Sequence, residues 1–229
     1  MTFQQDNQLI EILRDMQRCP HLETFTLAGS AEICDGAIYC PTNGYAPRAF
    51  GGAKGNLDDV KVVIVSNGPT TPIYDEKYTG DPDSDLELML SDQYMQSEPR
   101  NIHPNLKLFL DWVFPESQEN LDEQLKHAWL TNSVHCTFKT EPRIKDRRRC
   151  ANAYLVKALK LFTNPAVVLA GSKAQSLRSF LFSEITNPCI IECHSFSAPF
   201  AKGKNVAIEE WKNAARECQE YIKRRDGGS

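Results

Sequence analysis

Apolar residues in this chain follow two patterns: short continuous runs, and repeats spaced three to four residues apart. The runs are bounded by turn residues and predict buried parallel strands. They cover residues 60–66, 128–134, 165–171 and 187–194. The repeats predict helices with one apolar face. These cover residues 7–16, 103–114, 148–162, 172–182 and 205–225.

The order of these elements predicts the fold class. Strands alternate with helices, which is typical of a parallel sheet covered on both faces. We therefore expect an α/β protein with three layers, α/β/α, around a central, mainly parallel, four-stranded sheet. Functional residues in such sheets gather where the strands end at their carboxyl edge. Four loops should converge there, at residues 66–72, 133–139, 169–175 and 193–200.

A single domain is expected over residues 1–226, with residues 227–229 as a tail. Residues 1–56 would hold an N-terminal helix and then an irregular segment that carries cysteines. An irregular stretch of this length is uncommon in a compact domain unless something fastens it. Cys34 and Cys40 could do so. Residues 73–100 read as an acidic insertion with little periodicity.

Charge is segregated along the chain, although the total is a mild −4. Residues 139–149 hold six Lys or Arg against two acids, and residues 73–99 hold eight acids against one Lys. Nucleic-acid affinity would therefore have to come from a local patch.

The sequence contains no apolar run long enough for a transmembrane helix. The first residues, MTFQQDNQLIEILRDM, lack the apolar stretch of a secretory signal. We therefore expect a cytoplasmic protein that does not contact a membrane. A monomer is a separate expectation.

Eight cysteines are many for a chain in a reducing compartment. Without a secretory signal, clustered cysteines indicate a metal or iron–sulfur site rather than a disulfide framework. The alternative is that they are small buried apolar residues, which is our expectation for Cys189, Cys193 and Cys218.

Several motifs occur in a fixed order along the chain. They are VKVVIVSNGPT at 60–70, TNSVHC at 131–136, a closing Cys150, AVVLAGSKAQSL at 166–177 and IIECHSF at 190–196. Their order and spacing resemble the uracil-DNA glycosylase superfamily, and in particular its iron–sulfur branch, often called family 4. That branch carries G-E-A-P-G, Asn-Val-Val-Lys-Cys, a second Cys, a Leu-Gly strand end and a late His-Pro-Ser. The resemblance spans roughly residues 34–215 and implies a DNA N-glycosylase that flips its target base.

The resemblance implies a [4Fe–4S] cluster. Cys136 and Cys150 match two ligands of that branch, and thiolates suit iron. The remaining two would be Cys34 and Cys40, although the family's C-x2-C is absent and Cys19 is an alternative to Cys34. Unpaired structural thiols are the competing interpretation.

The loop between the later two cysteines lies at the DNA in that branch. Basic side chains there would neutralise phosphates without reading sequence, and Ser195 would also contact DNA. The basic residues are Arg143, Lys145, Arg147, Arg148 and Arg149. The alternative is a solvated helix N-terminus, where the helix dipole makes three arginines unfavourable.

Two residues are expected to be catalytic. Asn67 stands where the branch has Glu, and its amide can orient a water molecule but cannot act as a general base. His194 stands at the His of His-Pro-Ser and could donate a hydrogen bond to O2 of the departing base. The competing interpretation is a structural histidine after a buried strand.

Base recognition would centre on Asn132, whose amide both donates and accepts hydrogen bonds and so fits uracil or cytosine. It could instead fasten backbone. Gly68 and Pro69 would border the base, and Tyr74 or Tyr78 could replace the family's stacking Phe.

Departures from the family motifs favour a modified base. These are SNGPT, HSF and the acidic insertion, which could hydrogen-bond a sugar. A phage-defence branch of the superfamily excises glucosylated hydroxymethylcytosine, and we expect this substrate. Uracil excision in DNA repair is the alternative. An inactive relative, a non-catalytic iron–sulfur DNA-binding protein and a structural protein remain open.

Overall fold

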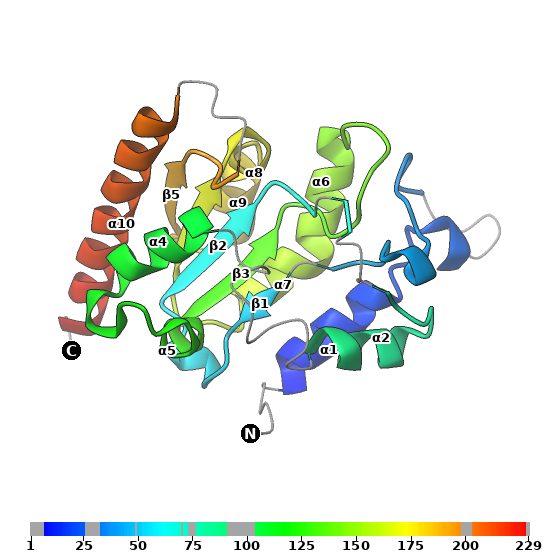
Figure 1. Cartoon of the computed structure of the whole chain (residues 1–229), viewed down its shortest axis with the longest axis horizontal. Helices are drawn as coiled ribbons and strands as arrows, with labels where there is room; N and C mark the ends of the chain where they lie inside the picture. Colours follow the sequence, from blue (N-terminus) through cyan, green and yellow to red (C-terminus); the bar gives the residue numbers. More distant parts are fainter. Residues whose placement is uncertain are drawn as a thin grey trace.

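A computed structural model describes residues 7–25, 33–48, 50–69, 71–72, 77–90, 104–197 and 203–227. Its centre is a five-stranded sheet in the order β1-β3-β2-β4-β5 (Figure 1). All neighbours are parallel except β1 and β3. The strands are β1 (Gly51–Gly52), β2 (Val62–Ser66), β3 (Ala128–Asn132), β4 (Ala166–Ala170) and β5 (Cys189–Cys193). The predicted α/β class is confirmed, with one strand more than expected.

The central strand β2 shows why the apolar runs were informative. Val62, Val63, Ile64 and Val65 are all buried, because β2 has a parallel neighbour on each side and helices cover both faces. A strand buried on both faces reads as a continuous β-branched run rather than an alternation.

Strand β1 has no such signal because it depends on glycine. Gly52 has φ +83°, and a β-carbon there would lie 2.0 Å from the carbonyl oxygen of Ala128. Only glycine allows this close approach. Two glycines carry no hydrophobic pattern, so the sequence did not predict this edge strand.

Helices cover the two faces of the sheet and form the outer layers. They are α1 (Asn7–Gln17), α2 (Pro82–Leu90), α4 (Pro104–Val113), α5 (Leu121–His127), α6 (Ile144–Cys150), α7 (Val156–Leu159), α8 (Ser172–Gln175), α9 (Arg178–Glu184) and α10 (Lys204–Gly227). One core joins α1, α7 and α9 to one face of the sheet. The other core joins α4 and α10 to the opposite face. None of the described helices is long and apolar enough to cross a membrane.

A single turn of π-helix, Ala151–Leu155, connects α6 to α7. The helical run therefore starts at Ile144, four residues before the predicted start, and continues to Leu159. Two further helices, α2 and α5, were not predicted. Helix α5 depends on a local cap, in which the side chain of Asn120 accepts a hydrogen bond from the backbone of Glu123 at 3.2 Å.

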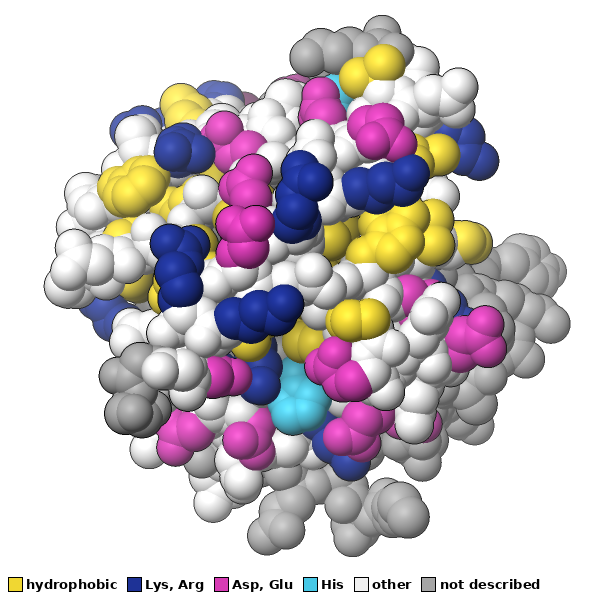
Figure 2. Space-filling model, turned by 90° about the vertical axis from the view of Figure 1, so that its left-hand side faces the viewer, with side chains coloured by type: hydrophobic (Ala, Val, Ile, Leu, Met, Phe, Trp, Pro, Cys, Tyr) yellow, Lys and Arg dark blue, Asp and Glu magenta, His cyan; other side chains and the backbone are white. Residues whose placement is uncertain are grey.

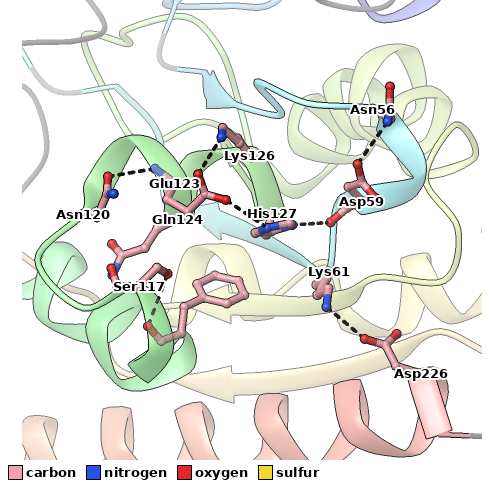
Figure 3. Close-up of polar contacts among 11 residues, drawn as sticks. Asn56, Asp59, Lys61, Ser117, Asn120, Glu123, Gln124, Lys126, His127 and Asp226 are labelled. Carbon is pink, nitrogen blue, oxygen red and sulfur yellow. Dashed lines mark hydrogen bonds and ion pairs between the residues drawn. The ribbon is translucent and has the colours of Figure 1, made fainter.

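Polar contacts fasten the amino edge of the sheet (Figure 3). The ring nitrogen Nδ1 of His127, just before β3, lies 3.0 Å from the carbonyl oxygen of Asp59. Lys61, just before β2, pairs with Asp226 of α10 at 2.9 Å. These contacts tie both strand starts to their neighbours, and the loops predicted to carry the site lie at the opposite edge.

Candidate active site and cysteine cavity

The carboxyl ends of the strands bring together residues that the sequence placed in separate loops. Asn67 follows β2 and His194 follows β5, while Gly171 follows β4, which lies between them. A β-carbon built on Gly171 would lie 2.9 Å from Asn67 Oδ1 and 3.1 Å from Ser195 Cβ. The loops after β2, β4 and β5 are therefore in contact, as expected from the topology.

Asn67 is held by two other elements. Its Oδ1 accepts a hydrogen bond from the backbone N–H of Ala174 in α8 at 3.3 Å. Its carbonyl oxygen accepts a hydrogen bond from the hydroxyl of Ser133, which follows β3. The amide is thus fixed at the edge of the sheet, as a group that positions a reactant requires.

The base-reading candidates of β2 and β3 lie beside Asn67. Asn132 is only 5% exposed and pairs with Ser66 in the sheet register. Gly68 packs on the next loop, because a β-carbon there would lie 3.0 Å from Val134 Cγ2. Pro69 is half-buried.

Neither Tyr74 nor Tyr78 can be assigned as the residue that stacks on the base from the described part of the chain. Tyr78 is 5% exposed and belongs to the hydrophobic core on the α1 side of the sheet. Its backbone N–H also donates to the carbonyl oxygen of Pro41 at 3.0 Å. Tyr78 is therefore not placed to stack on a base, because its side chain is buried in the core. Tyr74 lies outside the described residues.

His194 has a carboxylate partner that the sequence did not reveal. Its Nδ1 lies 2.5 Å from Oε2 of Glu210 in α10. The indole N–H of Trp211 donates to the carbonyl oxygen of His194 at 2.9 Å. An acid on an amphipathic helix reads as a solvated side chain, so no sequence signal identified Glu210.

The basic segment divides into a buried and an exposed part. Arg147 is 3% exposed, so its guanidinium is not accessible to a phosphate at the surface. It donates to the hydroxyl of Ser133 at 3.0 Å and pairs with Glu141. Its predicted DNA contact is therefore corrected to a structural role: it ties α6 to the loop that holds Asn67.

The other cations of the segment differ in their surroundings. Lys145 and Arg148 are exposed. Arg143, also exposed, donates through Nε to the buried carboxylate of Asp146 at 2.8 Å. Arg149 is half-buried and lies 3.8 Å, from Nη1 to Sγ, from Cys34. By contrast, basic and acidic side chains are interspersed over the face that carries α10 (Figure 2).

Four cysteines line one cavity beneath this segment. Cys19 follows α1, Cys34 lies in the irregular segment, Cys136 follows β3 and Cys150 ends α6. Apolar side chains make up most of the remaining wall: Met16, Leu22, Pro47, Val134 and Phe138. Segments far apart in the sequence thus present four thiols to a common, largely apolar space.

The four cysteines that line the cavity differ from the four predicted ligands at a single position. Cys40 is not among the residues that line the cavity, and its Sγ lies 3.9 Å from the hydroxyl of Thr42. Cys19 takes its place, because the chain returns on itself: the backbone N–H of Cys34 donates to the carbonyl oxygen of His21 at 2.9 Å. Cys193 and Cys218 are core residues, as expected.

Burial is the largest influence on the pKa of Cys34, Cys136 and Cys150, and it raises all three. It raises the pKa of Cys136 well above its ordinary value, and the neighbouring Cys150 raises it further. Burial also raises the pKa of Cys34, while the guanidinium of Arg149 opposes that shift. A raised pKa favours the protonated thiol at these three cysteines, so iron would have to displace those protons.

Four cysteine thiols on one cavity are the type of donor that a [4Fe–4S] cluster takes. Within the described residues, no three Cys, His, Asp or Glu side chains are close enough to hold one metal ion. The four thiols instead surround a space. A [4Fe–4S] cluster takes four cysteine thiolates, each on a different iron, so its ligands stand apart.

Neither a scan against protein-family models nor a search of curated proteins finds a match for this chain.

Proposed function

We propose that this protein is a DNA glycosylase that hydrolyses the N-glycosidic bond of a flipped pyrimidine and leaves an abasic site. The proposed target is a modified cytosine such as glucosylated hydroxymethylcytosine, and the proposed cofactor is a [4Fe–4S] cluster. The resemblance in motif order gives the reaction class. The geometry of the carboxyl edge and the cavity supports it.

The observation that carries the proposal is the cavity of four thiols and its relation to α6. This helix begins among exposed cations and ends at Cys150, so a cluster would anchor the segment that faces DNA. The cluster would be held by Cys19, Cys34, Cys136 and Cys150. When bound, it would fix four distant segments to one another and stabilise the folded state.

Catalysis would take place at the carboxyl edge, next to α6. The strands β2 and β3 point towards the end of the molecule where α6 stands (Figure 1). Asn132 would read the edge of the flipped base, and Asn67 would orient the attacking water. Exposed cations such as Lys145 and Arg148 would neutralise backbone phosphates.

The preference for a modified base rests on the departures in the loops after β2 and β5. Two acids in the described part of the acidic insertion, Asp83 and Asp85, have other partners. Asp83 of α2 pairs with Arg14, at 3.3 Å, and with Arg18. The buried carboxylate of Asp85 accepts hydrogen bonds from Thr79 and from Gly80. These two acids fasten α2 to its surroundings, so they are not available to hydrogen-bond a sugar on the target base.

A base-release assay on the whole chain, purified anaerobically, tests the proposal. The DNAs are phage DNA with glucosylated hydroxymethylcytosine, uracil-containing DNA and unmodified DNA, with abasic sites scored by alkaline cleavage. Cleavage of the glucosylated DNA alone is the expected result. Cleavage of uracil DNA alone would keep the glycosylase and overturn the substrate. No cleavage of any DNA, with DNA binding intact, would favour a non-catalytic binding protein.

A matched pair of asparagine variants ties activity to the site. Asn67→Ala should lower base release about 10²-fold, the order expected when a positioned reactant is lost. It should leave DNA binding unchanged. Asn213→Ala removes an exposed amide of α10 that bonds to Arg216 at 2.7 Å, and should have no effect. Iron and acid-labile sulfide per chain are measured on the same preparations.

A further inference from the structure

We infer that His194 is the general base that deprotonates the attacking water, and that Glu210 is the positioning residue that gives it this role. The inference rests on the proposed glycosylase function and changes the part expected of His194. The sequence suggested a hydrogen-bond donor to the leaving base. The observation that changes this is the 2.5 Å contact between Nδ1 of His194 and Oε2 of Glu210.

A carboxylate accepts hydrogen bonds and cannot donate them when ionised. The ring nitrogen that faces Glu210 must therefore carry the proton. In the neutral imidazole the other nitrogen, Nε2, then holds a lone pair. A ring in this tautomer accepts a proton at Nε2 and cannot donate one there to O2 of the base.

The surroundings hold His194 in this position. The indole N–H of Trp211 binds its carbonyl oxygen at 2.9 Å, and the Trp211 side chain is fully buried between α10 and the sheet. Cys193, the preceding residue, is also buried in that core. Glu210 and Trp211 are consecutive residues of α10, so one helix fixes both the backbone and the ring of His194.

His194 with Glu210 supplies the general base that Asn67 cannot provide. The loop after β2 carries an amide where the resembled branch has a carboxylate, and an amide does not take up a proton at neutral pH. Asn67 therefore orients water without activating it. A histidine with a carboxylate behind it is a well-suited general base, because the carboxylate fixes the tautomer and stabilises the imidazolium that forms.

The step balances as follows. The water oxygen forms the bond to C1′ of the sugar, and one water proton moves to Nε2 of His194. The electron pair of the C1′–N1 bond leaves with the pyrimidine, which departs as an anion. Transfer of the proton from the imidazolium to that anion, directly or through solvent, restores neutral His194.

Nitrogen NMR of the histidine side chains tests the tautomer without any catalytic assay. The chain has five histidines, and the signals of His194 are identified by their loss in His194→Gln. At neutral pH we expect Nδ1 protonated and Nε2 unprotonated, with the population shifting towards the other tautomer in Glu210→Gln. A proton on Nε2 in the unaltered protein, alone or together with one on Nδ1, would overturn the inference.

Kinetics on the DNA that the protein cleaves give the second readout. Glu210→Gln should lower kcat by about 10²-fold or more, the scale of general-base catalysis, with KM and DNA affinity unchanged. Glu209→Gln is the matched control, because Glu209 is exposed and pairs with Lys212 at 2.8 Å. Equal activity of the two variants would overturn the role of Glu210. Failure of the unaltered protein to cleave any DNA would overturn the proposed function, while the NMR result would still decide the tautomer.

Discussion

The carboxyl edge of the sheet has no room for a side chain at Gly171, and replacing this glycine by alanine tests how tightly the site is assembled. The added β-carbon would lie 2.9 Å and 3.0 Å from the two terminal atoms of Asn67, and 3.1 Å from Ser195 Cβ. Gly171 also has φ +92°, where a side chain is strained. The variant therefore meets two separate penalties.

The conformational penalty is about 1–3 kcal/mol for a non-glycine residue in this region. The steric penalty falls on Asn67, which must move or give up its hydrogen bond from the backbone of Ala174. A displacement of about 1 Å at a catalytic group costs about 10²-fold in rate. We therefore expect Gly171→Ala to lose about 2 kcal/mol of stability, or about 4–8 °C in Tm for a chain of this size, and about 10²-fold in base release.

Gly203 provides the control. It has φ +90°, but a β-carbon there would meet nothing within 4 Å. Gly203→Ala should therefore show the conformational penalty in thermal unfolding and keep base release. If Gly171→Ala released base as fast as Gly203→Ala at equal folded fraction, the contact around Gly171 would have no part in the function, and the assembled edge would be the wrong site.

Three further predictions concern other parts of the molecule. Cys19→Ser should lower the iron and sulfide content per chain after anaerobic purification, whereas Cys40→Ser should retain both. The reverse result would make Cys40, and not Cys19, a ligand of the proposed cluster. Arg147→Ala should lower the free energy of unfolding by about 1–3 kcal/mol, measured by urea denaturation, because it removes a buried side chain and its charge-assisted hydrogen bond to Ser133. Arg148→Ala should keep stability and reduce the salt dependence of DNA binding by about one phosphate contact; equal stability of the two arginine variants would contradict the burial argument. Gly52→Ala should disrupt the pairing of β1, seen as faster amide exchange along that edge, and unchanged exchange would show that the backbone adjusts.

The sequence predicted the parallel strands because β2 is buried on both faces and so has a continuous β-branched run. It did not predict β1, whose place depends on a close approach to Ala128 that only glycine allows. The apolar periodicity also missed α5, whose start depends on the cap at Asn120. In each case a specific contact, rather than a periodic pattern, determines the element.

The sequence predicted those residues of the candidate site that directly follow a strand. Asn67 and His194 follow apolar runs, and parallel topology brings such positions to one edge. Glu210 was not predictable, because its contact with His194 arises only when α10 packs on the sheet. The presence of Cys19 rather than Cys40 on the cavity likewise depends on how the chain folds back between α1 and Cys34.

The π-turn after Cys150 determines the directions in which the side chains before it point relative to those after it. A π-turn accommodates one residue more than an α-turn, and each residue of an α-helix turns the chain by about 100°. Deleting the exposed Asn152 would make the run from Ile144 to Leu159 regular and rotate its first half against its second by about that angle. Leu155 and Val156 would stay in the core, while Cys150 would turn away from the other three thiols. The extra residue of the π-turn therefore lets one helical run place Leu155 and Val156 in the core and Cys150 at the cavity. Its deletion would move Cys150 out of the cavity without replacing any side chain of the core or the cavity.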